Sequence, residues 1–198
     1  TEAITTVARG LGLSKSDKVL LPINEHHSNI LPWMREASLA WIEQDPEQPL
    51  DITAVISALE RERPRVLAFS ATSNVTGVTN PSAEICRAAR RLGILTCIDA
   101  SQSVPHEEVS VPALGCDFIA FSGHKMLAPT GIGVLTGLPE ALDRLEPLIL
   151  GGGSVERVTT HGYALRPLPY RLEAGTPNIS GAIGLAAAVD YLTAIGFA

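Results

Sequence analysis

The stretch that decides the fold is Asp117-Phe118-Ile119-Ala120-Phe121-Ser122-Gly123-His124-Lys125. Its first five residues form an apolar run, which predicts a short buried strand over 117–121. Lys125 follows that strand in a polar turn, and a glycine- and proline-rich segment at 128–133 comes next. Ligands of α/β proteins bind outside the carboxyl ends of the strands. The pattern therefore places Lys125 at a ligand crevice, although a lysine after a strand can also be a plain solvated turn residue.

Outward from this stretch, apolar strands alternate with predicted helices along the chain. Strands are predicted over 18–23, 39–42, 65–70, 92–98, 117–121 and 132–135. Helices are predicted over 1–13, over 29–39, from Asp51 onward, after Asn80-Pro81, over 139–147 and from Gly181 to about 195, with a short turn at 111–114 and loops after Gly151. This alternation predicts an α/β fold in three αβα layers around a mostly parallel sheet.

Composition narrows the function classes. The chain has 198 residues, 45% hydrophobic and 18% charged, which is typical of one globular domain. The net charge is -6 and no dense basic cluster occurs, which argues against nucleic acids and anionic membranes as partners. There is no apolar run of about 20 residues, and no signal peptide is expected. The three cysteines lack metal-type spacing, so no metal site is predicted and buried thiols in a reducing, cytoplasmic compartment are expected.

Polar residues gather after four of the predicted strands. These loops carry His26 with His27, Asn74, Asp99 with Gln102, and Ser122 with His124 and Lys125. Because the carboxyl ends of parallel strands share one edge of a sheet, these side chains could converge on a single pocket. The start of the first predicted helix, at Thr1 and Glu2, could offer backbone N–H groups to a phosphate.

These residue types fit a pyridoxal 5'-phosphate cofactor. A desolvated lysine loses its proton readily, and a neutral amine condenses with an aldehyde to a Schiff base. Asp99 can keep a pyridinium nitrogen protonated, which makes the ring an electron sink. Gln102 and Asn74 can hydrogen-bond the phenolic oxygen, Ser122 and His124 can contact the phosphate, and an imidazole can stack on the ring.

Each of these residues also has a simpler interpretation. Asp99 could cap a helix, Asn74 could be only a turn residue, and one of His26 and His27 could be an ordinary loop histidine. His106 and His161 are assigned to structural roles. The agreement of several residues at one edge of one sheet favours the cofactor site.

Several motifs resemble those of a known family. It is the class V aminotransferases of fold type I, and within it the group II cysteine desulfurases and selenocysteine lyases. The matching motifs are T-E-A-I at 1–4, E-H-H-S-N-I-L-P-W at 25–33, S-N-V-T-G at 73–77, I-D-A-S-Q-S at 98–103, G-C-D-F-I-A-F-S-G-H-K at 115–125, P-T-G-I-G at 129–133, G-G-G-S at 151–154 and R-L-E-A-G-T-P-N at 171–178. They span nearly the whole chain, and the paired histidines after glutamate favour the group II branch.

The resemblance implies a role for each matching residue. Lys125 would be the Schiff-base lysine and proton shuttle, and His26 would stack on the ring and assist proton transfer. Thr176 would reach the phosphate of a neighbouring subunit, which implies a homodimer. The implied cofactor-binding residues are Thr1, His26, Asn74, Asp99, Gln102, Ser122, His124, Lys125 and Thr176. Residues 1–198 would form the large domain that binds pyridoxal phosphate, as a fragment without a short N-terminal segment and a C-terminal small domain.

The implied reaction removes sulfur from cysteine, or selenium from selenocysteine, and leaves alanine and an enzyme persulfide. The persulfide would supply iron–sulfur cluster assembly or another sulfur acceptor. In the family the persulfide cysteine and the arginine that binds the substrate carboxylate lie in the C-terminal domain, and Cys86, Cys97 and Cys116 do not resemble that cysteine. Two alternatives stay open: a C–S β-lyase, epimerase or aminotransferase on the same scaffold, and a non-catalytic scaffold domain. We also expect exposed apolar surface and marginal solubility for the isolated piece.

Overall fold

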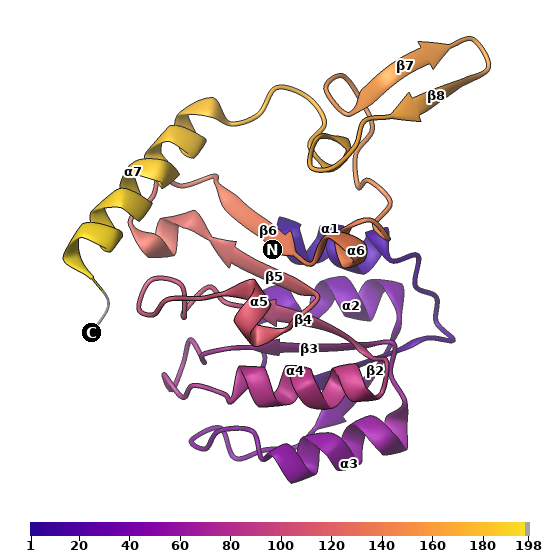
Figure 1. Cartoon of the computed structure of the whole chain (residues 1–198). Helices are drawn as coiled ribbons and strands as arrows, with labels where there is room; N and C mark the ends of the chain where they lie inside the picture. The colour runs from indigo at the N-terminus through magenta and orange to yellow at the C-terminus, as the bar shows by residue number, and fades with distance from the viewer. Residues whose placement is uncertain (197–198) are drawn as a thin grey trace.

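A six-stranded sheet forms the centre of the molecule (Figure 1). The computed structural model describes residues 1–196, so the last two residues of the predicted domain 1–198 lie outside the described part. In spatial order the strands are β2 (Ser38–Ile42), β1 (Lys18–Pro22), β3 (Val66–Ser70), β4 (Leu95–Asp99), β5 (Phe118–Ser122) and β6 (Gly133–Gly137). The first five are parallel, and β6 is antiparallel to β5. The prediction of an α/β fold with a mostly parallel sheet is confirmed.

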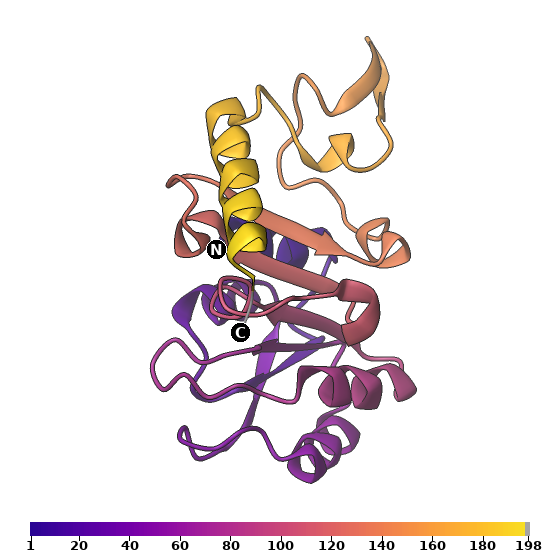
Figure 2. The ribbon, with the colours of Figure 1, turned by 60° about the vertical axis from the view of Figure 1, so that its left-hand side comes forward.

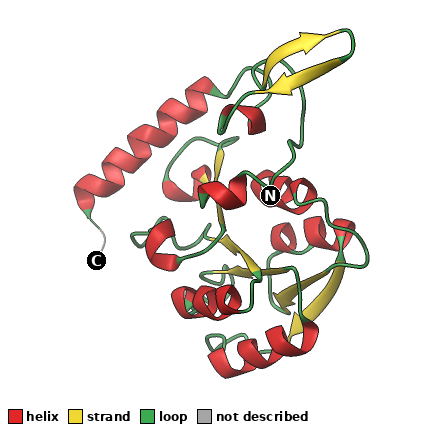
Figure 3. Ribbon diagram, turned by 45° about the vertical axis from the view of Figure 1, so that its right-hand side comes forward, coloured by secondary structure: helices red, strands yellow, loops and turns green. Residues whose placement is uncertain are grey.

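Helices cover both faces of this sheet (Figure 3). Successive side chains of β3 point to opposite faces, so Leu67 and Phe69 belong to one core cluster, and Val66 and Ala68 to the other. The first cluster is covered by α3 (Ile52–Glu62), α4 (Ser82–Arg91) and α5 (Val111–Leu114). The second is covered by α1 (Glu2–Gly10), α2 (Leu31–Glu36) and α6 (Pro139–Leu142). The result is the predicted three-layer arrangement.

Some predicted elements have different bounds in the structure. The helix predicted over 29–39 divides into a 3-10 turn, η1 (His27–Asn29), and the short helix α2. The helix predicted over 139–147 ends at Leu142, where Arg171 Nη2 donates to the carbonyl oxygens of Leu142 at 3.3 Å and Asp143 at 2.6 Å. That guanidinium supplies donors to carbonyl oxygens at the end of the helix, and the chain continues in 3-10-type turns in which Leu145 N donates to Leu142 O at 3.1 Å.

The segment after Gly151 contains structure that the sequence does not predict. Strands β7 (Val155–Thr159) and β8 (Gly162–Leu165) form an antiparallel hairpin that projects away from the main sheet (Figures 1 and 2). Four of the five residues of β7 are exposed, so no buried face gives the strand an alternating apolar pattern. The 3-10 turn η3 (Tyr170–Leu172) follows. The final helix α7 (Ile179–Ile195) confirms the helix predicted from Gly181 to about 195.

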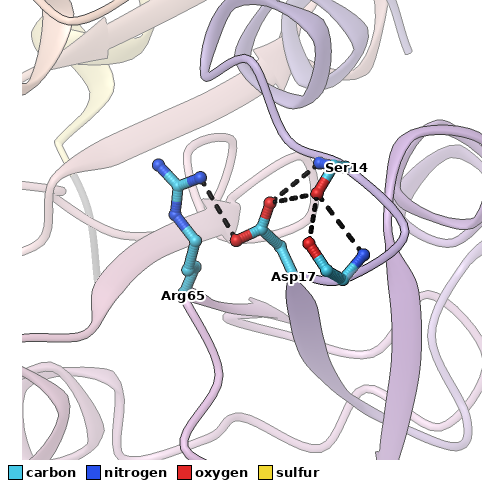
Figure 4. Close-up of polar contacts among 4 residues, drawn as sticks. Ser14, Asp17 and Arg65 are labelled. Atoms are coloured by element: carbon cyan, nitrogen blue, oxygen red, sulfur yellow. Dashed lines mark hydrogen bonds and ion pairs between the residues drawn. The ribbon is translucent and has the colours of Figure 1, made fainter.

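The amino end of β1 is held by an exposed polar cluster. Asp17 Oδ2 accepts hydrogen bonds from the backbone N–H of Ser14 at 2.8 Å and from its hydroxyl at 2.9 Å (Figure 4). Its Oδ1 lies 3.3 Å from Nη1 of Arg65, the residue before β3 (Figure 4). The Ser14 hydrogen bonds, assisted by the Arg65 charge, lower the pKa of Asp17. This cluster fastens the start of β1 to the start of its neighbour β3.

Candidate active site

The opposite, carboxyl edge of the sheet carries the polar residues that the sequence points to. Asp99 ends β4 and pairs with Ala120 of β5, and β5 leads directly into the 3-10 turn η2 (Gly123–Met126) that contains Lys125. His26 follows β1, and Asn74 lies in the loop after β3. The structure therefore brings residues from four strands to one edge of the sheet, as predicted. Asp99 and Lys125 follow directly neighbouring strands.

The order of the strands creates a crevice at this edge. From β1 the chain goes outward to β2, and it then returns to add β3 on the other side of β1. Such a reversal of strand order separates the loops that follow the two strands, and ligands of α/β proteins bind at that point. Asn74 lines a small polar pocket there together with Glu25, Ser70 and Asn80.

Asp99 is buried, with 9% of its surface exposed. Its Oδ1 accepts the backbone N–H of Ser101 at 3.0 Å. The segment after Asp99 is a series of turns and not a helix, so the alternative that Asp99 caps a helix is wrong. Asp99 instead stabilises the first of these turns. Within residues 1–196 no hydrogen bond reaches its Oδ2. One carboxylate oxygen is therefore fixed by the protein, and the other is available to a donor from a ligand.

Lys125 lies on η2 and is half-buried, so it is less enclosed than the sequence suggests. The turn that presents it depends on Gly123, because a Cβ at this position would lie 2.7 Å from Cγ2 of Ile132. Leu127, which ends the turn, has a left-handed backbone with φ of 68°. The close packing of Gly123 before Lys125 and the left-handed backbone of Leu127 after it fix the position of the Lys125 backbone. Ser122 is half-buried and His124 is exposed on the same turn.

His26 and Thr1 meet through Ser28. The backbone N–H of Ser28 donates to Nδ1 of His26 at 3.1 Å. The hydroxyls of Ser28 and Thr1 lie 2.7 Å apart, which ties the start of α1 to the turn after β1. Both predicted residues are therefore at one place, and both are exposed. His27 is exposed too, with its ring centroid 6.0 Å from that of His26.

The remaining predicted residues are less closely connected. Gln102 is half-buried in the turns after Asp99, and Asn74 is exposed. Thr176 is exposed in the segment before α7, and no hydrogen bond within residues 1–196 joins it to the other predicted residues. Its neighbour Asn178 donates to the carbonyl oxygen of Gly131 at 3.0 Å, so this segment is tied to the turn after η2.

A buried polar cluster around Glu25 at the same edge was not predicted. Glu25 is 8% exposed, and its carboxylate accepts hydrogen bonds from Asn29 Nδ2 at 2.7 Å, from Ser70 N at 2.7 Å and from Ser70 Oγ at 2.6 Å. Trp33 Nε1 donates to Asn29 Oδ1 at 3.1 Å. Burial raises the pKa of Glu25, and the nearby charge of Asp99 adds to the rise. The local sequence shows Glu25, Asn29 and Trp33 four residues apart each time, but the contact with Ser70, 45 residues away, has no sequence signal.

The three cysteines are buried free thiols, as predicted. Burial raises the pKa of Cys86 to about 12 and that of Cys116 to about 11, and it raises the pKa of Cys97 as well. A nucleophilic cysteine needs a low pKa and access to its substrate. None of the three therefore provides a thiolate near neutral pH.

Residues 1–196 show neither a metal site nor a membrane-spanning helix. No group of three or more His, Cys, Asp or Glu residues in this part of the chain is arranged to hold a metal ion. Among the described helices, none combines the length and the apolar composition needed to cross a membrane.

A doubly covered parallel sheet with polar residues at its carboxyl edge defines a class of ligand-binding α/β proteins. Comparison with known proteins identifies the family within that class. The sequence model of the Aminotransferase class-V family matches residues 1–198, and the chain belongs to this family. The family membership predicted from the motifs is confirmed.

The relatives share one name. The chain is 40% identical over 208 residues to a probable cysteine desulfurase of Streptomyces coelicolor, and 42% identical over 205 residues to a cysteine desulfurase of Dickeya dadantii. Each match covers 99% of this chain and 50% of the relative. The apo structure of a cysteine desulfurase from Thermococcus onnurineus NA1 superposes with a TM-score of 0.92 at 42% identity, covering 98% of this chain and 50% of that one. The chain thus spans about half the length of the relatives it matches, and fold type I is confirmed.

Pyridoxal 5'-phosphate is the cofactor that this family membership implies, and the donor set fits it. The cofactor needs an amine for its aldehyde, an acid for its ring nitrogen and hydrogen-bond donors for its phosphate. Lys125 and Asp99 follow neighbouring strands, and Asp99 keeps one oxygen free of protein hydrogen bonds within residues 1–196. Hydroxyl groups of Thr1 and Ser122 stand at the same edge.

Proposed function

We propose that residues 1–198 form the large, cofactor-binding domain of a pyridoxal phosphate-dependent cysteine desulfurase. The observation that carries the proposal is the placement of Asp99 and Lys125 after adjacent parallel strands, with His26 at the same edge. The name shared by the relatives at about 40% identity supports the reaction. Because the chain spans half of those relatives, the activity of the whole protein is inferred from them.

The proposal gives each residue a task. Lys125 would hold the cofactor through its aldehyde, and its amine would accept the proton of the substrate Cα. Asp99 would hold the ring nitrogen through its free oxygen, and His26 would stack on the ring. The bound cofactor withdraws electrons from the substrate Cα, which makes that proton removable. The remaining contacts go to the phenolic oxygen (Gln102 and Asn74) and to the phosphate (Thr1, Ser122 and His124).

The partners belong to the proposal as well. The substrate is cysteine or selenocysteine, and the sulfur passes to an acceptor protein. Thr176 is exposed, as a residue that reaches a second subunit must be, and this supports a homodimer. The cytoplasmic location follows the reducing environment that three buried free thiols favour.

The test is a product analysis of the full-length protein loaded with pyridoxal phosphate. With cysteine and a thiol reductant, we expect alanine and sulfide in equal amounts. A C–S β-lyase would instead give pyruvate and ammonia, and an aminotransferase would need a keto acid. A full-length protein that folds and forms no visible absorption band with the cofactor would support a non-catalytic scaffold and contradict the proposal.

A further inference from the structure

Glu25 links the chain after β1 to the end of β3, at the point where these two strands separate. The register between β1 and β3 extends over Val19↔Val66 and Leu20↔Leu67 only, whereas β3 and β4 pair over five residues. Ile23 N donates to Ile42 O of β2. Because backbone N–H groups alternate in direction along a strand, the backbone nitrogen of Pro22 points toward β3, and proline has no N–H to donate there. The ladder therefore ends here. Glu25 Oε1 accepts a hydrogen bond from the backbone N–H of Ser70, the last residue of β3.

Donors at the two ends of the cluster fix the direction of its hydrogen bonds. The indole N–H of Trp33 can only donate, so Asn29 must turn its oxygen toward Trp33 and its NH2 group toward Glu25. The backbone N–H of Ser70 also can only donate, and it meets the other oxygen of Glu25. Both oxygens of Glu25 must therefore accept. A glutamine here would turn its NH2 group toward another donor.

The same cluster anchors the turn that carries His26. Glu25 lies directly before His26, and Asn29, which closes the turn, donates its backbone N–H to the carbonyl oxygen of His26 at 2.7 Å. Inside the turn, Nδ1 of His26 accepts from the backbone N–H of Ser28. In the neutral ring the proton then sits on Nε2.

We propose that Glu25 is a positioning residue, whose buried carboxylate holds the turn 25–29 against the end of β3 and so fixes the orientation of the His26 ring. This deepens the proposed function, on which it rests, because it gives the exposed His26 a buried anchor on the neighbouring residue. The other charged or titratable groups that interact with Glu25 are Asp99 and Cys97 on β4. Cys97 is buried and neutral, so Asp99 is the only other charge in this set.

An exchange of side chains tests the hydrogen-bond logic. Glu25→Gln breaks one hydrogen bond, whereas the double variant Glu25→Gln with Asn29→Asp swaps amide and carboxylate. In the double variant the new NH2 group at position 25 donates to the new carboxylate at position 29, and that carboxylate still accepts from Trp33. The Ser70 hydroxyl can accept as well as donate, so the direction of every bond is satisfied. Asp17→Asn, at the other end of β1, is the matched control for losing one acid.

The readouts are the circular dichroism of the bound cofactor in the visible region and kcat/KM of the full-length holoenzyme. We expect Glu25→Gln to lower the cofactor dichroism and to reduce kcat/KM by as much as about 100-fold, since displacing a catalytic group by about 1 Å has that cost. The double variant should recover most of both, and Asp17→Asn should change neither. If Glu25→Gln fails to fold, a double variant that folds with wild-type dichroism still supports the proposal.

Several results would overturn it. One is a folded Glu25→Gln holoenzyme with wild-type dichroism and kcat/KM. Another is a folded double variant whose dichroism and kcat/KM are no higher than those of Glu25→Gln. A third is that the double variant and Glu25→Gln both fail to fold. The proposed function fails separately: in that case the wild-type protein itself shows no cofactor dichroism and releases no sulfide from cysteine.

Discussion

Asp17 and Glu25 stand at opposite ends of the same strand, β1, and their surroundings have opposite effects. Asp17, at the amino end, is half-buried, still reached by solvent, and accepts hydrogen bonds that lower its pKa. Glu25, at the carboxyl end, accepts three hydrogen bonds, and yet burial raises its pKa. Similar hydrogen bonds thus accompany opposite shifts, because the loss of water at Glu25 outweighs them.

The comparison extends to the whole sheet. At the amino edge, charged residues such as Asp17, Arg65 and Lys18 form partly exposed ion pairs, which contribute little stability. At the carboxyl edge, the acids Glu25 and Asp99 are buried and Lys125 is half-buried, so these ionisable groups have lost much of their contact with water. Groups that are costly to bury are typical of functional sites. The two edges should therefore respond differently to substitution.

The largest difference is expected between two lysines. Lys125→Ala should abolish the visible absorption band of the bound cofactor and lower the desulfurase activity by more than about 100-fold, because proton transfer by a positioned group contributes at least that much. Lys18→Ala, at the amino end of β1, removes only an ion pair with Glu62 and should leave both unchanged. Absorption spectra and sulfide release from the full-length protein check this. A Lys125→Ala protein with a normal band and activity would refute the assignment.

The next effect concerns the stability contributed by the two acids. Glu25→Ala leaves the N–H of Ser70 and the NH2 of Asn29 without their acceptor in a buried place, which should cost about 2–4 kcal/mol of unfolding free energy. Asp17→Ala should cost clearly less, because water can replace the lost acceptor. Urea denaturation of the two variants and the wild type measures both. Equal losses would mean that burial does not separate the two sites.

A smaller effect is expected at the glycine of the Lys125 turn. Gly123→Ala should lower the unfolding free energy by about 1–3 kcal/mol, because the new methyl group would overlap Ile132. Gly162→Ala, in the projecting hairpin, meets no heavy atom within 4 Å and should stay within about 0.5 kcal/mol. Thermal or urea unfolding of the two variants tests this pair. A harmless Gly123→Ala would show that η2 is not tightly packed.

The smallest and most specific effect is the pH dependence of stability. The raised pKa of Glu25 means that the folded protein binds a proton at this residue more tightly than the unfolded protein does. The contribution of Glu25 to the free energy of unfolding is therefore fully present below about pH 4.3, and it is lost as pH rises through the folded pKa. The lowered pKa of Asp17 has the opposite sign: its contribution is present above about 3.9 and is lost as pH falls through the folded pKa.

The stability difference between wild type and each single variant isolates these contributions. For Glu25→Gln the advantage of the wild type should shrink as pH rises, and for Asp17→Asn it should grow and then level off. Denaturation midpoints between about pH 3 and 7 give both curves. Slopes of the same sign would contradict the contrast between the two acids.

The sequence predicted the main sheet and much of the site for a physical reason. Buried parallel strands are continuous apolar runs, and the residue that follows such a run lies at the carboxyl edge, so Asp99 and the Lys125 turn could be placed in advance. The β7–β8 hairpin was missed because it buries almost nothing. Glu25 was missed because its partner Ser70 lies 45 residues away, and only the folded sheet brings the two together.

The most direct test is a crystal structure of the full-length protein grown with pyridoxal 5'-phosphate. The account predicts a covalent bond from Nζ of Lys125 to the cofactor, Oδ2 of Asp99 within hydrogen-bonding distance of its ring nitrogen, and the His26 ring stacked on it. A cofactor bound elsewhere, or one whose ring nitrogen turns away from Asp99, would contradict it.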